Sequence, residues 1–185
     1  MIKDCTILGI DPGTNLLGYG VVSVVSGKPK YVDMGVFDLR KMTDPYDKLA
    51  NINAGVEELI AVHNPQYLAV ESPFYGKNAQ VILKLGRAQG AAIIAAAKNG
   101  VEVREYAPRR AKIAICGNGA ASKEQVAMMV EKTLGIDIAP EHLDATDALA
   151  IAMCHFYQMG SPSAGTKVAD SWAKFLKENP DRIKR

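Results

Sequence analysis

The sequence predicts an α/β fold in which one mixed five-stranded sheet is flanked by helices. Three β-rich segments near the N-terminus follow one another across short turns, which favours an antiparallel meander. Helical and strand patterns then alternate, which is typical of parallel βαβ units. The chain has 185 residues and is 48% hydrophobic, which is enough to bury one substantial core.

The meander is predicted to consist of strands at residues 6–10, 19–25 and 31–39. These segments are rich in β-branched residues, which fit a pleated surface. Asp-Pro-Gly-Thr separates the first two strands and Ser-Gly-Lys-Pro the next two, and both are turn sequences. We expect Gly18 and Gly20 to keep the second strand from crowding ligands bound at the end of the first.

Periodicity and end signals place the other elements, which we expect to be a helix between residues 45 and 64, a buried strand at 67–71, a helix at 78–98, a strand at 101–106, and helices at 122–134 and 144–157. Asp44-Pro45 and Asn64-Pro65 bound the first helix. Ser122 and Gln125 have the spacing of a capping box.

The predicted globular domain covers residues 1–158, and residues 159–185 are expected to form a partly helical or disordered tail. That tail begins in small and polar residues and ends basic. The longest apolar stretch, at residues 91–97, is too short to span a membrane. The N-terminus lacks the features of a secretory signal, so we expect a cytoplasmic protein. Three widely spaced cysteines are expected to be buried free thiols.

Charge is distributed unevenly along the chain. Residues 77–132 contain ten basic and four acidic side chains, so this segment carries +6 in a chain whose net charge is only +2. A basic middle between acidic flanks suits a surface that binds a polyanion beside a cluster of carboxylates. A helix surface solvated by lysines explains the same composition equally well.

Four carboxylates occupy places from which they can converge. Asp11 ends the first strand and Glu71 ends the fourth. If these strands are parallel neighbours, both side chains emerge at one edge of the sheet. Asp144 and Asp147 are three residues apart and share a face of the last helix. Each acid alone also suits a turn, an ion pair or a helix N-terminus, but four such coincidences are needed to explain all of them.

A cluster of four carboxylates would need a cation. Oxygen ligands without histidine or cysteine favour Mg²⁺ or Mn²⁺ over zinc. Two such ions can activate water and stabilise a leaving oxygen in phosphodiester hydrolysis. The sequence therefore predicts a nuclease, with the basic middle holding the nucleic acid.

Three segments resemble bacterial RuvC, the family of Holliday junction resolvases. They are "ILGIDPGTNLLGYGVV", "VESPFYGKNAQVILKLGRAQG" and "LDATDALAIA", and the similarity runs in order from about residue 7 to residue 157. The resemblance implies an RNase H-like nuclease domain and a homodimeric, Mg²⁺-dependent endonuclease that makes paired nicks in four-way DNA junctions. It also implies the branch-migration proteins RuvA and RuvB as partners.

Carried over residue by residue, the resemblance places the catalytic acids at Asp11, Glu71, Asp144 and Asp147. We expect Asp11 to bridge two metal ions, Glu71 and Asp147 to bind one each, and Asp144 to complete the shell or orient water. The DNA-binding residues that the resemblance and the basic segment indicate are Phe74, Lys112, Lys123, Lys77, Arg109 and Arg110. Phe74 would stack on an unpaired base and the lysines would contact phosphates.

The Gly- and Ala-rich segment at residues 86–100 suits either a dimer contact or packing on the chain's own sheet. Two other classes of protein share part of the sequence pattern. Gly-Ile-Asp-Pro-Gly-Thr also resembles the first phosphate-binding hairpin of actin-like ATPases, but those proteins need two domains and a second such hairpin. A module that binds junctions without cutting them would keep the basic segment but would not need four acids.

Overall fold

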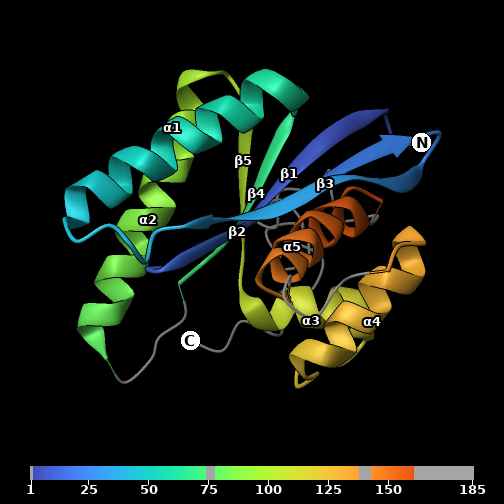
Figure 1. The fold of residues 1–185 in the computed structure, drawn as a ribbon. Coiled ribbons are helices and arrows are strands. Elements are labelled where there is room, and N and C mark those ends of the chain that lie inside the picture. Colours follow the sequence, from blue (N-terminus) through green and yellow to red (C-terminus); the bar gives the residue numbers. More distant parts are fainter. Residues whose placement is uncertain (1, 74–77, 138–142, 161–185) are drawn as a thin grey trace, which may run out of the picture.

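The computed structural model describes residues 2–73, 78–137 and 143–160. Its centre is a five-stranded sheet with the order β3-β2-β1-β4-β5 (Figure 1). The strands are β1 (Cys5–Asp11), β2 (Leu16–Val25), β3 (Lys28–Asp38), β4 (Tyr67–Glu71) and β5 (Glu102–Tyr106). The first three pair antiparallel, whereas β4 pairs parallel with both β1 and β5. The predicted mixed sheet is confirmed.

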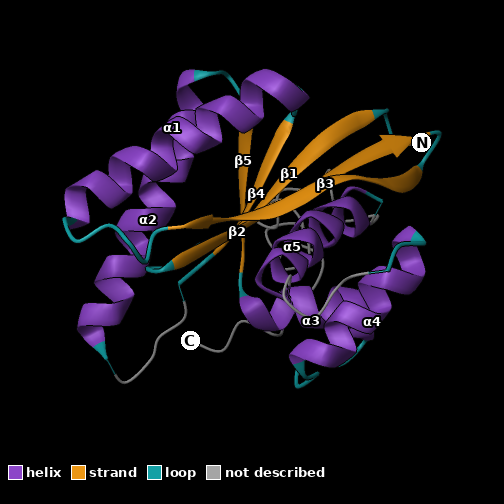
Figure 2. Ribbon diagram, in the orientation of Figure 1, coloured by secondary structure: helices purple, strands orange, loops and turns teal. Residues whose placement is uncertain are grey.

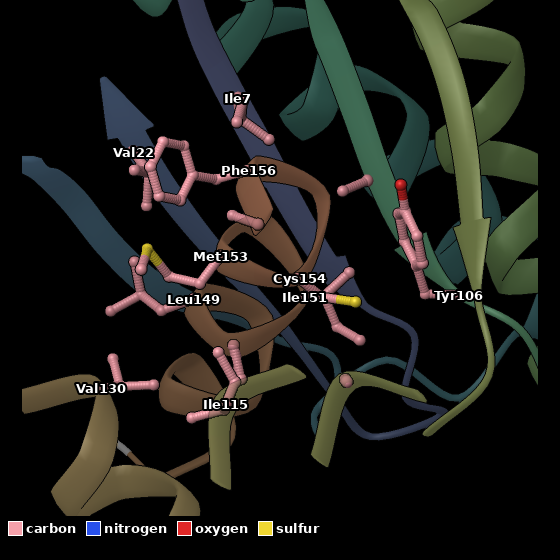
Figure 3. Packing of buried hydrophobic residues seen from close by; sticks show 14 of the residues in the cluster. Ile7, Val22, Tyr106, Ile115, Val130, Leu149, Ile151, Met153, Cys154 and Phe156 are labelled. Atoms are coloured by element: carbon pink, nitrogen blue, oxygen red, sulfur yellow. The ribbon is translucent and has the colours of Figure 1, made fainter. Parts of the chain in front are cut away.

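Helices cover both faces of the sheet (Figure 2). One face carries α1 (Pro45–His63) and α2 (Ala79–Lys98), and the other carries α3 (Pro108–Cys116), α4 (Lys123–Leu134) and α5 (Leu143–Met159). Strand alternation divides the core between these layers. Leu8 and Ile10 of β1 pack with α1 and α2, and Ile7 packs with α5. Figure 3 shows the second cluster, in which Met153 and Phe156 of α5 lie beside Val22 of β2.

The helix ends follow the capping signals in the sequence. Asp44 caps α1 by accepting bonds from the amides of Tyr46 and Asp47, and Asn64 ends it in the left-handed conformation. Both halves of the Ser122–Gln125 capping box are present at the start of α4. This cap fixes the start of α4, whose first residue is Lys123.

Helix α3 was not predicted from the sequence. Pro108 occupies its first turn, where a missing amide hydrogen costs nothing. Gly117 ends it with a φ of 70°, and Ala111 and Ile115 form its buried face. These signals were present, but the helix has only nine residues and three of them are basic. The hairpin strands are also longer than predicted, since β2 begins at Leu16 and β3 at Lys28.

Three glycines let α5 approach the sheet closely. Gly9 lies opposite Gly20 in the β1–β2 ladder, and Gly18 lies opposite Asp11. A Cβ on Gly9 would be 2.1 Å from the carbonyl oxygen of Ala148, and a Cβ on Gly18 would be 2.2 Å from the carbonyl oxygen of Asp144. These glycines therefore make room for the backbone of α5 itself.

The expected tail falls almost wholly outside the described residues, which end at residue 160. Among the helices described, none combines the length and apolarity needed to cross a membrane. All three cysteines are free, but only Cys154 is buried as predicted, whereas Cys5 and Cys116 are half-buried.

Candidate active site

Strand alternation directs Asp11 and Glu71 to the same face of the sheet. Gly9 of β1 faces α5, so Asp11, two residues later, faces it too. Ala69 of β4 belongs to the α5 core cluster, so Glu71 also points to this side. Because β1 and β4 are parallel neighbours, the two carboxylates emerge at one end of the sheet, as predicted.

The first turns of α5 bring the other two acids to this edge. Asp144 and Asp147 lie one turn apart and both are partly exposed. The glycine contacts hold the backbone of Asp144 directly against Gly18, which is the ladder partner of Asp11. The sheet and α5 thus fix the relative positions of the acids through backbone contacts.

A pocket of about 240 Å³ opens where these elements meet. It is lined by Asp11, Glu71, Asp147, Lys112, Lys123, Pro108, Ala111, Val126, Ala150 and Ile151. Three predicted acids and two predicted lysines therefore share one cavity. Its apolar wall, from α3, α4 and α5, was not predicted, because no pattern in the sequence indicates that α3 packs here.

Lys123 forms ion pairs with both acids of α5. Its Nζ lies 2.7 Å from Oδ2 of Asp147 and 3.5 Å from Oδ1 of Asp144. The capping box of α4 places this side chain, because Lys123 directly follows the Ncap residue Ser122. Asp144 does not line the pocket itself but is joined to it through this lysine.

Lys112 approaches the pocket from α3. Its Nζ donates a hydrogen bond of 2.7 Å to the carbonyl oxygen of Ala121, in the connection before α4. This bond ties α3 to the start of α4 and holds the half-buried lysine close to Glu71. The positive charge of Lys112 favours the ionised form of Glu71. Two ammonium groups from two helices therefore reach the same cavity.

Crowding of the carboxylates disfavours their charged forms. Burial, followed by repulsion from Glu71 and Asp147, raises the pKa of Asp11 to about 8. Burial and the charge of Asp147 raise the pKa of Glu71 to about 7, against the opposing effect of Lys123 and Lys112. Burial would lower the pKa of Lys123, but the hydrogen bond to Asp147 raises it. The pocket therefore favours additional positive charge.

This donor set fits a hard divalent cation. The pocket offers carboxylate oxygens from three elements and neither histidine nor cysteine. Within residues 2–73, 78–137 and 143–160, no three acidic, histidine or cysteine side chains form a group that could hold a metal ion as they stand. Asp147 is instead paired with Lys123, so a metal would have to compete with this ammonium group for the carboxylates.

Two other predicted DNA-binding residues, Arg109 and Arg110, do not line the pocket. Arg109 and Arg110 are exposed on α3, and Arg110 donates to Oε1 of Gln158 at 2.7 Å. Phe74 and Lys77 lie in residues 74–77, outside the described residues.

Comparison with known proteins gives a consistent result. Residues 7–155 match the family model described as "Crossover junction endodeoxyribonuclease RuvC". The protein of that name from Bacteroides fragilis is 48% identical over 185 residues, covering 99% of this chain and 98% of the relative.

Two solved structures of Thermus thermophilus RuvC are also similar. The first has a TM-score of 0.75 and 38% identity, covering 84% of this chain and 96% of that one. The second, in complex with a Holliday junction substrate, has a TM-score of 0.73 and 34% identity, covering 82% of this chain and 93% of that one. The fold is RNase H-like, and nucleases of this family depend on metal ions. The chain belongs to the RuvC family of crossover junction endodeoxyribonucleases.

Proposed function

We propose that this chain is a metal-dependent endonuclease that resolves Holliday junctions by paired symmetric nicks, in recombination and DNA repair. The observation that carries the proposal is the pocket in which Asp11, Glu71 and Asp147 meet Lys112 and Lys123. Carboxylates that bind metal and ammonium groups that bind phosphate are what phosphodiester hydrolysis needs. The similar Thermus thermophilus protein has been solved with a Holliday junction substrate.

The four acids would hold two Mg²⁺ ions, with Mn²⁺ as an alternative. When bound, these ions lower the pKa of a water and neutralise charge on the leaving oxygen. Asp11 interacts electrostatically with the acids of both β4 and α5, so it would be a ligand common to both ions. Glu71 and Asp147 would each hold one ion, and Asp144 would orient water or complete the coordination.

The two lysines would neutralise the phosphates of the bound DNA. Lys112 already faces the pocket, anchored at Ala121. A divalent cation at Asp147 would repel the ammonium group of Lys123, which would then be free to contact a phosphate. Arg109 and Arg110 extend the basic surface along α3, and Phe74 and Lys77 remain predicted DNA contacts.

A homodimer would present two such pockets to the two strands that must be cut. Its contact is proposed on α2, where Leu83 and Ile94 are 62% and 57% exposed. Gly86 and Gly90 lie between them with open space beyond their Cα atoms, so a partner helix can approach closely. This face is separate from the buried side of α2, which packs on the sheet.

The remaining proposals concern location, partners and domain bounds. We infer a cytoplasmic location and keep RuvA and RuvB as the partners that the resemblance implies. Residues 1–158 form the proposed nuclease domain, and residues 159–185 the proposed tail.

Asp11→Asn tests the function directly. The variant keeps the shape of the side chain but loses a metal-binding oxygen, so we expect it to bind a synthetic four-way junction and not to cut it. Cleavage is measured with Mg²⁺ and with EDTA, and products are mapped on all four strands beside a linear duplex of matched sequence.

Asp47→Asn serves as the matched control, because Asp47 is an exposed acid in the first turn of α1. Cleavage by Asp11→Asn at the wild-type rate would show that Asp11 is not needed for catalysis. ATP hydrolysis without nicking by the wild-type chain would favour the actin-like alternative, and junction binding without nicking would favour a binding module.

A further inference from the structure

A second and larger pocket, of about 470 Å³, lies at the same end of the sheet but on the face covered by α1 and α2. It is lined by Gly13, Thr14, Asn15, Leu39, Thr43, Pro45, Tyr46, Lys48, Leu49, Ile52, Lys84, Arg87 and Ala88. No residue lines both this pocket and the carboxylate pocket. We call it the α1–α2 pocket. Its Arg87 borders the α2 face proposed for the dimer contact, and no other function proposed above uses the pocket.

The rim of the α1–α2 pocket is positively charged. Lys48, Lys84 and Arg87 contribute three positive charges, and no aspartate or glutamate is among the lining residues. Lys84 and Arg87 are exposed, and no ion pair occupies either of them within the part of the chain that the structure describes. The nearby carboxylate of Asp44 is already engaged by two amides of the α1 cap. This rim is therefore free to bind an anion.

Lys48 is already positioned by the turn between β1 and β2. Its Nζ lies 3.1 Å from the carbonyl oxygen of Thr14 and 3.4 Å from Oδ1 of Asn15. These contacts leave one ammonium hydrogen for a ligand and hold the half-buried lysine in place. A preorganised cation costs less entropy on binding than a mobile one.

The pocket also offers surfaces for an apolar or aromatic group. Its floor contains the buried side chains of Leu39 and Ile52 together with Ala88. At its edge stands Tyr46, which is 69% exposed in the first turn of α1. Basic side chains beside an exposed aromatic ring form the combination that binds single-stranded nucleic acid, by charge and by stacking.

The α1–α2 pocket lies within reach of a strand that occupies the carboxylate pocket. Asp11 is three residues before Thr14, so their Cα atoms are at most about 11 Å apart. One DNA strand carries a phosphate about every 3.4 Å of helix axis, so about three nucleotides span that distance. A strand cut beside Asp11 can therefore continue across the β1–β2 turn into this pocket.

We propose that the α1–α2 pocket binds one nucleotide of the cleaved DNA strand, a few nucleotides from the cut. Lys48, Lys84 and Arg87 hold its phosphate, and its base stacks on Tyr46. The inference rests on DNA being the substrate of the carboxylate pocket. It adds a site that helps to choose where the strand is cut, on the opposite face of the sheet from the metal-binding acids.

Binding of the full chain to a fluorescent four-way junction in EDTA tests the proposal, because EDTA prevents cleavage. The affinities of the wild type and the Lys84→Ala/Arg87→Ala variant are measured over a range of salt. The log–log salt slope should become flatter by about 0.9 for each phosphate that the variant no longer neutralises. Lys98→Ala is the control, since Lys98 lies on the same helix about 21 Å from Lys84 and pairs with Glu57.

Tyr46 gives a second and independent readout. Tyr46→Ala should weaken binding about 5- to 140-fold, the contribution of one stacked base, without changing the salt slope. Tyr46→Phe keeps the ring and should restore the affinity. Thermal unfolding and molecular mass of each variant are measured alongside, to separate DNA binding from folding and assembly.

Several results would overturn the proposal. One is an unchanged salt slope in the double variant together with an affinity of Tyr46→Ala within twofold of the wild type. A changed molecular mass would assign Lys84 and Arg87 to subunit assembly instead. Saturable binding of thymidine monophosphate, abolished in the double variant while junction affinity stays unchanged, would make this a site for a free nucleotide. Cleavage assays keep the two proposals apart, because Asp11→Asn tests only the carboxylate pocket.

Discussion

Replacing Gly18 by alanine should disable cleavage without unfolding the protein. The new Cβ would lie 2.2 Å from the carbonyl oxygen of Asp144, and ordinary contact begins near 3.4 Å, so α5 must retreat by about 1.2 Å. A misplacement of about 1 Å in a catalytic site can lower the rate about 100-fold. The accompanying overpacking should cost about 1–3 kcal/mol of stability. We therefore expect kcat to fall about 100-fold.

The assay is single-turnover cleavage of a four-way junction, with junction affinity measured in EDTA and stability measured by thermal unfolding. Gly35→Ala is the matched control, because its Cβ would meet the hydroxyl of Tyr19 at 2.7 Å and its ring at 2.8 Å, on the opposite face of the sheet from the acids. This control should lose stability and keep its rate. A folded Gly18→Ala protein with the wild-type kcat, or an equal loss of rate in Gly35→Ala, would refute the reasoning.

Three further predictions concern the charges of the carboxylate pocket. Lys112→Ala should flatten the salt dependence of junction binding by about 0.9 in log–log slope, and an unchanged slope would exclude a phosphate contact. Lys123→Ala should lower the stability of the metal-free protein by less than about 1 kcal/mol, because the Lys123 side chain is 54% exposed. The same variant should bind Mg²⁺ more tightly in calorimetry, and weaker binding would contradict the competition between Lys123 and a metal ion for Asp147. In EDTA, stability should fall as pH rises from about 4 to about 8, because folded Asp11 and Glu71, with pKa values of about 8 and about 7, retain protons that the unfolded chain releases. Thermal unfolding across this range measures the effect, which Asp11→Asn should reduce.

The sequence revealed those parts of the site that depend on local pattern. Asp11 and Glu71 were identified because each ends an apolar strand, and parallel strands bring such ends together. Asp144 and Asp147 were identified because residues three apart share a helix face. The order of strands and helices likewise predicted the mixed sheet that the structure confirms.

The parts that depend on distant packing were not predictable. The pairing of Lys123 with Asp147 joins the start of one helix to the first turns of another, and no local pattern encodes it. Gly18 was expected to keep its strand from crowding the bound metal ions or the DNA, whereas it receives the backbone of α5. The α1–α2 pocket draws its cations from two helices and was equally invisible in the sequence.

The position of α5 in the chain sets when the active site can first exist. Among the described elements it is the last in chain order, although it packs against the first two strands. Asp11 and Glu71 leave the ribosome long before Asp144 and Asp147, and domains assemble as their segments emerge. A growing chain therefore carries only two of the four candidate catalytic acids until α5 docks. The order of the elements therefore leaves the proposed active site incomplete until the end of synthesis.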